Sequence, residues 1–127
     1  MIKWLENNRG FSVIFVILIA AEIFFFSSIS GGPPSPASIN VSIIYHFSVF
    51  FLLNFFLLTS LNKNGEIKIK YLIIASMLSI FYSVLDELHQ LFVPLRHAGL
   101  GDILTNSVGI LLSNLVYLYY KNNNLKI

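Results

Sequence analysis

Apolar residues gather in four long stretches of the chain, and polar or turn-forming residues separate them. Each stretch is close to the ~20 residues that an α-helix needs to cross the hydrocarbon core of a bilayer. The pattern predicts an all-α polytopic membrane protein, a bundle of four transmembrane helices that makes up a single domain over residues 1–127. The predicted helices cover about residues 11–29, 41–61, 71–93 and 103–120.

The segments between these stretches contain residues that end helices. Ser30–Pro36 is rich in glycine, which is conformationally loose, and in proline, which lacks an N–H donor. Asn62–Gly65 predicts a turn that leads into the charged segment Glu66–Lys70. Pro94–Gly101 is the third link, and Asn122–Asn124 is predicted to begin a polar tail.

The first apolar stretch follows two basic residues, Lys3 and Arg9, as the apolar part of a secretory signal peptide would. It is longer than the apolar part of a usual signal peptide, and it contains Glu22 near its middle. We therefore expect this stretch to be retained as a transmembrane helix.

Lysine and arginine are distributed asymmetrically about the four predicted helices. Cytoplasmic loops of membrane proteins carry an excess of both residue types. Along this chain, the segments between the predicted helices alternate between basic and almost without basic residues. Arg96 is the one basic residue left for the opposite side. We therefore expect a multi-pass protein of the cell membrane with both termini in the cytoplasm. The basic residues assigned to the cytoplasmic side are Lys3, Arg9, Lys63, Lys68, Lys70, Lys121 and Lys126.

Composition supports a membrane protein and excludes several other classes. Hydrophobic residues make up 56% of the chain and charged residues only 11%, whereas a soluble domain has about a quarter of its residues charged. The few basic residues form no basic run, so we expect membrane lipids and no nucleic acid as partners. The chain has no cysteine, which excludes disulfides, thiolate nucleophiles and cysteine-based zinc sites.

Four of the six acidic residues lie within or at the edge of the predicted helices, namely Glu22, Asp86, Glu87 and Asp102. An ionisable group in the hydrocarbon region costs several kcal/mol unless it is paired or hydrated, so each marks a candidate functional site. His46, early in the second helix, is expected at the same depth. All of these residues fall in the half of the bilayer predicted to face away from the cytoplasm.

Helical geometry groups these polar residues further. Asp86, His89 and Gln90 are predicted to project from one side of the third helix, with Glu87 at the flank. Asp102 and Asn106 share a face of the fourth helix, and Asp102 is also well placed to cap that helix. Arg96 lies between the two helices, where its planar guanidinium could clamp a carboxylate or a phosphate.

Each of these residues also has a purely structural interpretation. Glu22 could be a lone neutral carboxyl, His46 a hydrogen-bonded core histidine, and Asp102 a helix cap alone. Arg96 could anchor the chain at the membrane interface. Packing does not explain the segment 86–90, because four polar side chains within five residues are too costly there. The serines within the helices are expected to help the helices approach closely; they are Ser27, Ser28, Ser76, Ser79, Ser83 and Ser113.

The segment Asp86–Arg96, together with Asp102, Asn106 and Gly109, resembles the VanZ-like family of small membrane proteins. The family pattern is an acidic pair, a glutamine, a Phe-x-Pro-x-Arg segment, an aspartate six residues after the arginine, and an asparagine one turn later. All of these spacings hold here. The similarity extends to Phe26–Ser28, to the Pro/Gly-rich link, and to His46 followed by Phe47.

The resemblance implies a membrane protein whose family's founding member is linked to resistance to the lipoglycopeptide antibiotic teicoplanin. Members often carry Asp-Lys shortly before the histidine, and this chain has Ser42 and Ile43 at those positions. Any role of that pair is therefore missing here or taken over, for which Glu22 is a candidate. Similarity at the level of the family does not by itself transfer a resistance role.

Two classes of function fit these residues. The first is an enzyme that hydrolyses or transfers a group on a lipid-linked or amphiphilic phosphate or glycan of the cell envelope. Its acid/base groups would be Asp86 or Glu87, with His89 or His46 as proton shuttle. Arg96 would hold a phosphate, while Asp102 and Asn106 would orient the reacting groups, and Gln90 and Glu22 would contact the substrate. Carboxylates and histidines also suit a divalent metal, although no His-Glu-x-x-His signature is present.

The second class is a non-catalytic module that binds a lipid headgroup or a lipoglycopeptide, or that stabilises a partner membrane protein. Proton-coupled transport is disfavoured, because no charged residues continue the polar path towards the cytoplasmic side.

Overall fold

The computed structural model describes residues 1–33, 35–62, 68–96 and 98–124, which form five α-helices. The short helix α1 (Ile2–Asn7) precedes four long helices, which are α2 (Arg9–Ser27), α3 (Pro36–Leu61), α4 (Ile69–Gln90) and α5 (Leu100–Asn124). All four long helices are long and apolar enough to cross a membrane. The predicted all-α fold is thereby confirmed, and its four long helices are candidates to span a membrane.

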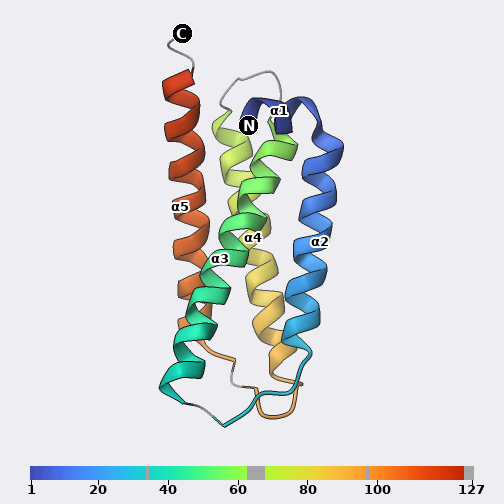
Figure 1. The fold of residues 1–127 in the computed structure, drawn as a ribbon, viewed down its shortest axis with the longest axis vertical. Coiled ribbons are helices and arrows are strands. Elements are labelled where there is room, and N and C mark those ends of the chain that lie inside the picture. The colour runs from blue at the N-terminus through green and yellow to red at the C-terminus, as the bar shows by residue number, and fades with distance from the viewer. Residues whose placement is uncertain (34, 63–67, 97, 125–127) are drawn as a thin grey trace.

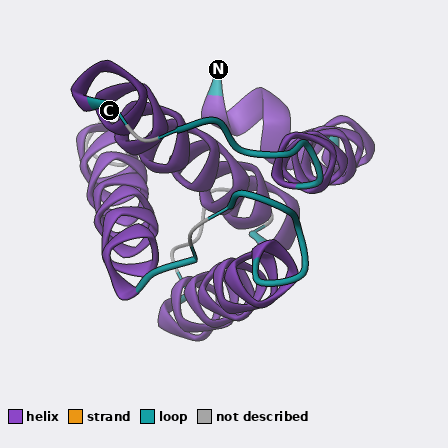
Figure 2. Ribbon diagram, turned by 90° about the horizontal axis from the view of Figure 1, so that it is seen from below, coloured by secondary structure: helices purple, strands orange, loops and turns teal. Residues whose placement is uncertain are grey.

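The four long helices run side by side along the long axis of the molecule (Figure 1). Helix α1 lies across the end that carries both chain termini, which we call the terminal end. The α2–α3 and α4–α5 links lie together at the opposite end, which we call the distal end (Figures 1 and 2). Helix α3 is central, because it packs against α1, α2, α4 and α5, most extensively against α5.

Two helix ends differ from the sequence-based prediction for clear local reasons. Helix α3 begins at Pro36 rather than near residue 41, because Ser35 and Ser38 form a capping box and Pro36 occupies the first turn. Helix α4 ends at Gln90 rather than near residue 93, and turns occupy the following residues up to Pro94. A proline disfavours helical conformation in the residue before it.

The other helix ends were also predicted imperfectly. Helix α2 covers Arg9–Ser27 and is shifted towards the N-terminus, and α1 was not predicted. Helix α5 continues through Asn124, beyond its predicted end near residue 120, so the polar residues from Asn122 to Asn124 are still helical. Polar residues beyond the hydrocarbon region remain compatible with helix, and the apolar pattern marks only the buried part. The predicted turn at 63–65 and the first two residues of the charged segment Glu66–Lys70 lie outside the described residues.

Serine side chains join the helices through hydrogen bonds. Each of the serines expected to promote close packing is bonded to a polar side chain of another helix, which sharpens that prediction. These bonds satisfy the polar groups of the serines in apolar surroundings, where no water is available as a partner. The pairs are Ser27 with Asp86, Ser28 with His89, Ser76 with Asn114, Ser79 with Asn54, Ser83 with Asn106 and Ser113 with Asn54.

Asn54, in the second half of α3, has a side chain that is fully buried. Its Nδ2 donates to the Ile110 carbonyl at 3.3 Å, to Ser113 Oγ at 3.3 Å and to Asn114 Oδ1 at 3.0 Å. Its Oδ1 accepts a hydrogen bond from Ser79 Oγ at 3.2 Å. Asn54 therefore ties the central helix to both α4 and α5.

At the terminal end, Glu6 of α1 is buried against α5. Lys121 Nζ lies 2.6 Å from Glu6 Oε1, and Tyr117 donates its hydroxyl hydrogen to the same carboxylate at 2.5 Å. The carboxylate is thus neutralised by a lysine and hydrogen-bonded by a tyrosine. This cluster fixes the N-terminal helix to the last turns of α5.

Helices α3 and α5 approach closely at Gly109. A Cβ atom added to Gly109 would collide with the Phe47 carbonyl of α3. A Cβ added to Gly101, at the start of the same helix, meets nothing within 4 Å. Gly109 is therefore a requirement of packing, and Gly101 is not.

We predict that Gly109→Ala lowers the free energy of unfolding by about 1–3 kcal/mol, because the added methyl group overpacks the α3–α5 contact. Thermal unfolding in detergent, followed by circular dichroism, measures the change. Gly101→Ala is the matched control and should leave the unfolding temperature unchanged or raise it, since alanine favours helix over glycine by ~1 kcal/mol. Equal unfolding temperatures for the two variants would contradict the packing argument.

Candidate functional site

The last turn of α4 turns its polar side chains towards the interior of the bundle. Asp86, Glu87 and Gln90 are buried, with exposed fractions of 5%, 4% and 2%. His89 is only partly buried. The buried face of α4 is therefore rotated about the helix axis relative to the predicted face. Glu87 lies in the interior, where His89 was expected, and His89 lies at the flank.

Asp86 links α4 to the end of α2. Ser27 Oγ donates to Asp86 Oδ1 at 2.5 Å, and Gln90 Nε2 donates to Asp86 Oδ2 at 3.1 Å. Gln90 Nε2 also lies 3.4 Å from Ser27 Oγ. Both oxygens of the Asp86 carboxylate are thus oriented by neighbouring donors, and the three residues form one rigid unit.

Glu87 points towards the link that precedes α5. The Gly99 backbone N–H donates to Glu87 Oε2 at 3.0 Å. The other oxygen, Oε1, is buried and has no hydrogen-bond partner among the described residues. One side of this carboxylate is therefore held in place while the other is available to a ligand.

His46 of α3 completes the group from a third direction. Its side chain is 4% exposed, and one ligand atom from each of His46, Asp86 and Glu87 lies within 4.8 Å of the others. The structure thus brings together two predicted acids and the histidine of the second predicted helix. This is also the set of described residues that could hold a metal ion.

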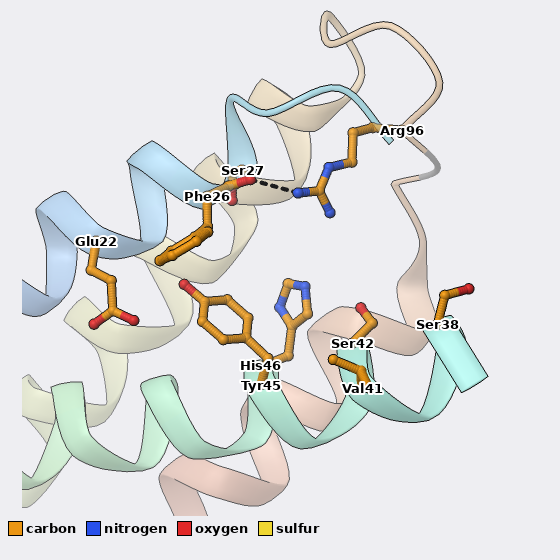
Figure 3. Close-up of a pocket in the computed structure, with 9 residues that line it drawn as sticks. All are labelled: Glu22, Phe26, Ser27, Ser38, Val41, Ser42, Tyr45, His46 and Arg96. Carbon is orange, nitrogen blue, oxygen red and sulfur yellow. Dashed lines mark hydrogen bonds between the residues drawn. The ribbon is translucent and has the colours of Figure 1, made fainter. Parts of the chain in front are cut away.

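A cavity of about 510 Å³ lies beside this group, between α2 and α3 (Figure 3). His46 and Tyr45 project into it from α3, and Phe26 and Glu22 face them from α2 (Figure 3). The Tyr45 hydroxyl is buried and has no hydrogen-bond partner among the described residues. The full lining is Glu22, Phe26, Ser27, Ser38, Val41, Ser42, Tyr45, His46 and Arg96.

A second cavity, of about 380 Å³, lies on the side of the α4–α5 link. Gln90 and Asp102 line it, and Arg96, Ser38 and Ser42 line both cavities. The Asp86–Gln90 segment therefore reaches the second cavity through Gln90.

Arg96 reaches across from the α4–α5 link to the end of α2. Its Nη2 donates to the Phe26 carbonyl at 2.5 Å (Figure 3). Its Nε donates to the Ile29 carbonyl at 3.0 Å. Carbonyls at a helix C-terminus lack partners within the helix, so the guanidinium completes this end of α2. The predicted clamp on a carboxylate is not what these bonds show, although Nη1 makes no hydrogen bond to a described residue.

The remaining predicted site residues have different surroundings. His89 stacks on Phe24, with ring centroids 4.8 Å apart, and its Nε2 lies 3.0 Å from Ser28 Oγ. It is therefore directed towards the surface of α2, and it does not line either cavity. Glu22 is exposed on α2 and lines the larger cavity.

The two site residues predicted in α5 also have different surroundings. Asp102 is the third residue of α5, whose first residue is Leu100, so the expectation that Asp102 caps this helix was wrong. It favours the helix start through its charge in the first turn. Asn106 is fully buried and donates from Nδ2 to Ser83 Oγ at 2.8 Å, one turn before the acidic pair.

Sequence reasoning missed three residues of the site. Ser27 was assigned only to helix packing, yet it contacts Asp86 and lines the larger cavity. Tyr45 and Ser42 also line that cavity. The positions of Tyr45 beside His46 and of Ser42 one helical turn before His46 were the available signals.

The family model described as VanZ/LLP1 matches residues 11–121, a range that contains every candidate site residue. Searches of curated proteins and of solved structures each found no significant match.

We predict that Arg96→Lys loosens the distal end. The single ammonium group of lysine cannot replace the planar guanidinium that contacts two carbonyls at once. The Gly31 amide reports on this contact, since it donates to the Pro94 carbonyl at 3.2 Å between the two distal links. Loss of ~1.4 kcal/mol would speed hydrogen–deuterium exchange at Gly31 by about tenfold.

Arg9→Lys provides the control for this experiment. Arg9 Nη2 donates to the Leu61 carbonyl at 3.3 Å, at the terminal end of the bundle. This variant should leave exchange at Gly31 unchanged. Unchanged protection in Arg96→Lys would contradict the role of Arg96 in holding the end of α2.

Proposed function

This chain belongs to the VanZ/LLP1 family, and we propose that it is a membrane-embedded enzyme of the cell envelope. Its substrate would be a lipid-linked or amphiphilic phosphate or glycan, on which it performs a hydrolysis or group transfer by acid/base chemistry. The observation that carries the proposal is the cavity of about 510 Å³ beside the buried acid pair. Its walls hold buried polar atoms that have no partner among the described residues.

The apolar rim of this cavity supports an amphiphilic substrate. Phe26 and Val41, which belong to its lining, are 44% and 67% exposed on the outer surfaces of α2 and α3. In a bilayer such side chains contact acyl chains. A lipid tail can therefore remain in the membrane while its polar headgroup enters between the two helices.

The polar side chains in and beside this cavity support acid/base chemistry on that headgroup. His46 and the carboxylates of Asp86 and Glu87 lie within reach of one another, and a proton donor and acceptor are the minimum for a hydrolysis or transfer step. We assign Asp86 or Glu87 as the base and His46 as the proton shuttle. His89 is a weaker candidate for the shuttle, because it contacts Phe24 and Ser28 outside the cavity.

The positions of the other polar residues support roles in binding. Arg96 lines both cavities, and its Nη1 remains for a phosphate oxygen. Glu22 and Gln90 each line one cavity and would contact polar groups of the substrate. Asp102 and Asn106 lie further along and would orient the link and the last turn of α4.

We further propose that the distal end faces away from the cytoplasm. The termini and the ends of the α3–α4 link share the terminal end (Figure 1). The described basic residues other than Arg96 all belong to helix ends there, as the positive-inside rule requires of a cytoplasmic face. They are Lys3, Arg9, Lys68, Lys70 and Lys121.

The orientation is tested with single-cysteine variants, because the chain has no cysteine of its own. Ser30→Cys lies in the exposed α2–α3 link, and Asn122→Cys lies on an exposed position at the end of α5. In intact cells, a membrane-impermeant maleimide should label Ser30→Cys, whereas Asn122→Cys should be labelled only after lysis. The reverse pattern would place the site in the cytoplasm.

The enzymatic proposal is tested with the purified chain in lipid nanodiscs and a panel of polyprenyl phosphates, polyprenyl diphosphates, lipid-linked glycans and phospholipids. We expect turnover of at least one of these lipids by the wild type. Asp86→Asn and Glu87→Gln should each lower the rate by about 10²-fold or more, because each removes a general acid or base.

Ser107→Ala is the control for these variants, because among the described residues the Ser107 hydroxyl hydrogen-bonds only to the Ile103 carbonyl of its own helix. It should keep the wild-type rate. The enzymatic proposal fails if the wild type binds headgroups without turning over any lipid while both acid variants lose binding. That result would instead favour the non-catalytic module.

A further inference from the structure

Three side chains at the distal end have the geometry of an incomplete metal site, and we propose that His46, Asp86 and Glu87 bind one divalent cation of the Zn²⁺ or Mn²⁺ class. One potential ligand atom of each lies within 4.8 Å of the others. Atoms bound to one such ion at ~2.0–2.2 Å are about 3.4 Å apart in a tetrahedral arrangement. Closing the site therefore requires only side-chain adjustments of about 1 Å.

His46 supplies an observation that is independent of the acidic cluster. Its ring is 4% exposed and projects from α3 into the cavity (Figure 3). Its buried Nδ1 has no partner among the described residues, and no hydrogen bond of the ring is found there. A buried polar atom without a partner lowers the stability of the fold, because it has lost its hydrogen bonds to water. Coordination of a cation by the imidazole would remove that cost.

Glu87 has the same property at one oxygen. Its Oε1 is buried without a partner in the described chain, while the Gly99 N–H holds Oε2 at 3.0 Å. Two members of the three-residue group thus carry atoms that lack partners. One cation placed among the three residues accounts for both.

The surroundings of Asp86 resemble those of a carboxylate that ligates a metal. Ser27 and Gln90 each donate to a different oxygen of Asp86, at 2.5 and 3.1 Å. Each carboxylate oxygen keeps a second lone pair for a cation. Hydrogen bonds of this kind orient metal-bound carboxylates, and their loss typically weakens metal binding by about 10–100-fold.

Charge balance also favours a cation. Asp86 and Glu87 are buried next to each other, and no described lysine or arginine forms a salt bridge with either. Arg96, at the same end, donates to the backbone carbonyls of α2. Uncompensated buried charges cost several kcal/mol each. A divalent ion balances two ionised carboxylates.

The donor set selects the class of cation. One imidazole nitrogen with two carboxylates suits Zn²⁺ or Mn²⁺, whereas Mg²⁺ and Ca²⁺ prefer sites made of oxygen ligands alone. Three protein ligands leave at least one coordination position open towards the cavity. If the proposed function holds, that position would take an oxygen of the substrate phosphate or a water molecule.

The test measures metal binding without any substrate. The full chain is purified in nanodiscs, stripped with a chelator and titrated calorimetrically with Zn²⁺ and Mn²⁺. Elemental analysis and the Mn²⁺ electron paramagnetic resonance spectrum follow on the reloaded protein. We expect about one ion per chain. His46→Gln, Asp86→Asn and Glu87→Gln should each lower the affinity by more than about 100-fold, and Ser27→Ala by about 10–100-fold.

Two variants provide matched controls. His89→Gln removes a histidine of α4 that contacts Phe24 and Ser28, and Glu22→Gln removes a carboxylate that lies outside the three-residue group. Both should keep the wild-type affinity and stoichiometry. Circular dichroism and gel filtration of each variant separate the loss of a ligand from the loss of the fold. Glu87→Asp, which keeps the carboxylate and shortens its reach, replaces Glu87→Gln if that variant does not fold.

The proposal is overturned if the wild type binds neither ion more tightly than the His46→Gln variant. It is equally overturned if His89→Gln abolishes binding while His46→Gln does not, since the ion would then lie elsewhere. Turnover of lipid by chelator-treated protein that binds neither ion would refute the metal site and leave the proposed enzymatic function standing. Stoichiometric binding without turnover would have the opposite meaning.

Discussion

A carboxylate buried among apolar helices must find hydrogen-bond donors or a cation, and this requirement organises the distal end of the molecule. Asp86 draws the end of α2 against α4 through Ser27, and Glu87 holds the start of the α5 segment through the Gly99 amide. Arg96, in the α4–α5 link, donates hydrogen bonds to backbone carbonyls at the C-terminal end of α2. The two distal links and three helix ends are therefore held together by polar contacts around one acidic pair, where an apolar contact alone would permit the ends to slide.

The two ends of the bundle satisfy their buried acids in different ways. At the terminal end, Glu6 is neutralised by Lys121 and hydrogen-bonded by Tyr117, so the cluster is complete within the chain. At the distal end, the carboxylates receive neutral donors, and buried polar atoms of Glu87 and His46 have no partner among the described residues. A completed cluster stabilises the fold, whereas an incomplete one beside a cavity is suited to a ligand. This contrast is the physical basis for assigning function to the distal end.

Much of this architecture was predictable from local properties of the chain. Four apolar stretches of bilayer length are sufficient to predict four helices. Lipid offers no hydrogen bonds to the backbone, and a helix satisfies its backbone groups within a single segment. The start of α3 was also readable, since Ser35, Pro36 and Ser38 carry the signature of a capped helix, although the apolar pattern alone obscured it. Helix α1 was not predictable in this way, because its stability depends on the buried contact of Glu6 with α5, more than a hundred residues away in the chain.

The sequence by itself determined which residues are costly to bury, and hence that the segment from Asp86 to Gln90 is the candidate for function. The penalty for a polar group in lipid depends on the residue type and its depth, and both can be read from the chain. Only the tertiary structure decided which side chains meet. It turned Glu87 inward and His89 outward, and it selected His46 from α3 as the histidine beside the acids. The rotation of a helix about its own axis is set by contacts with its neighbours, here Ser27 and Gly99, and no pattern within a single helix contains that information.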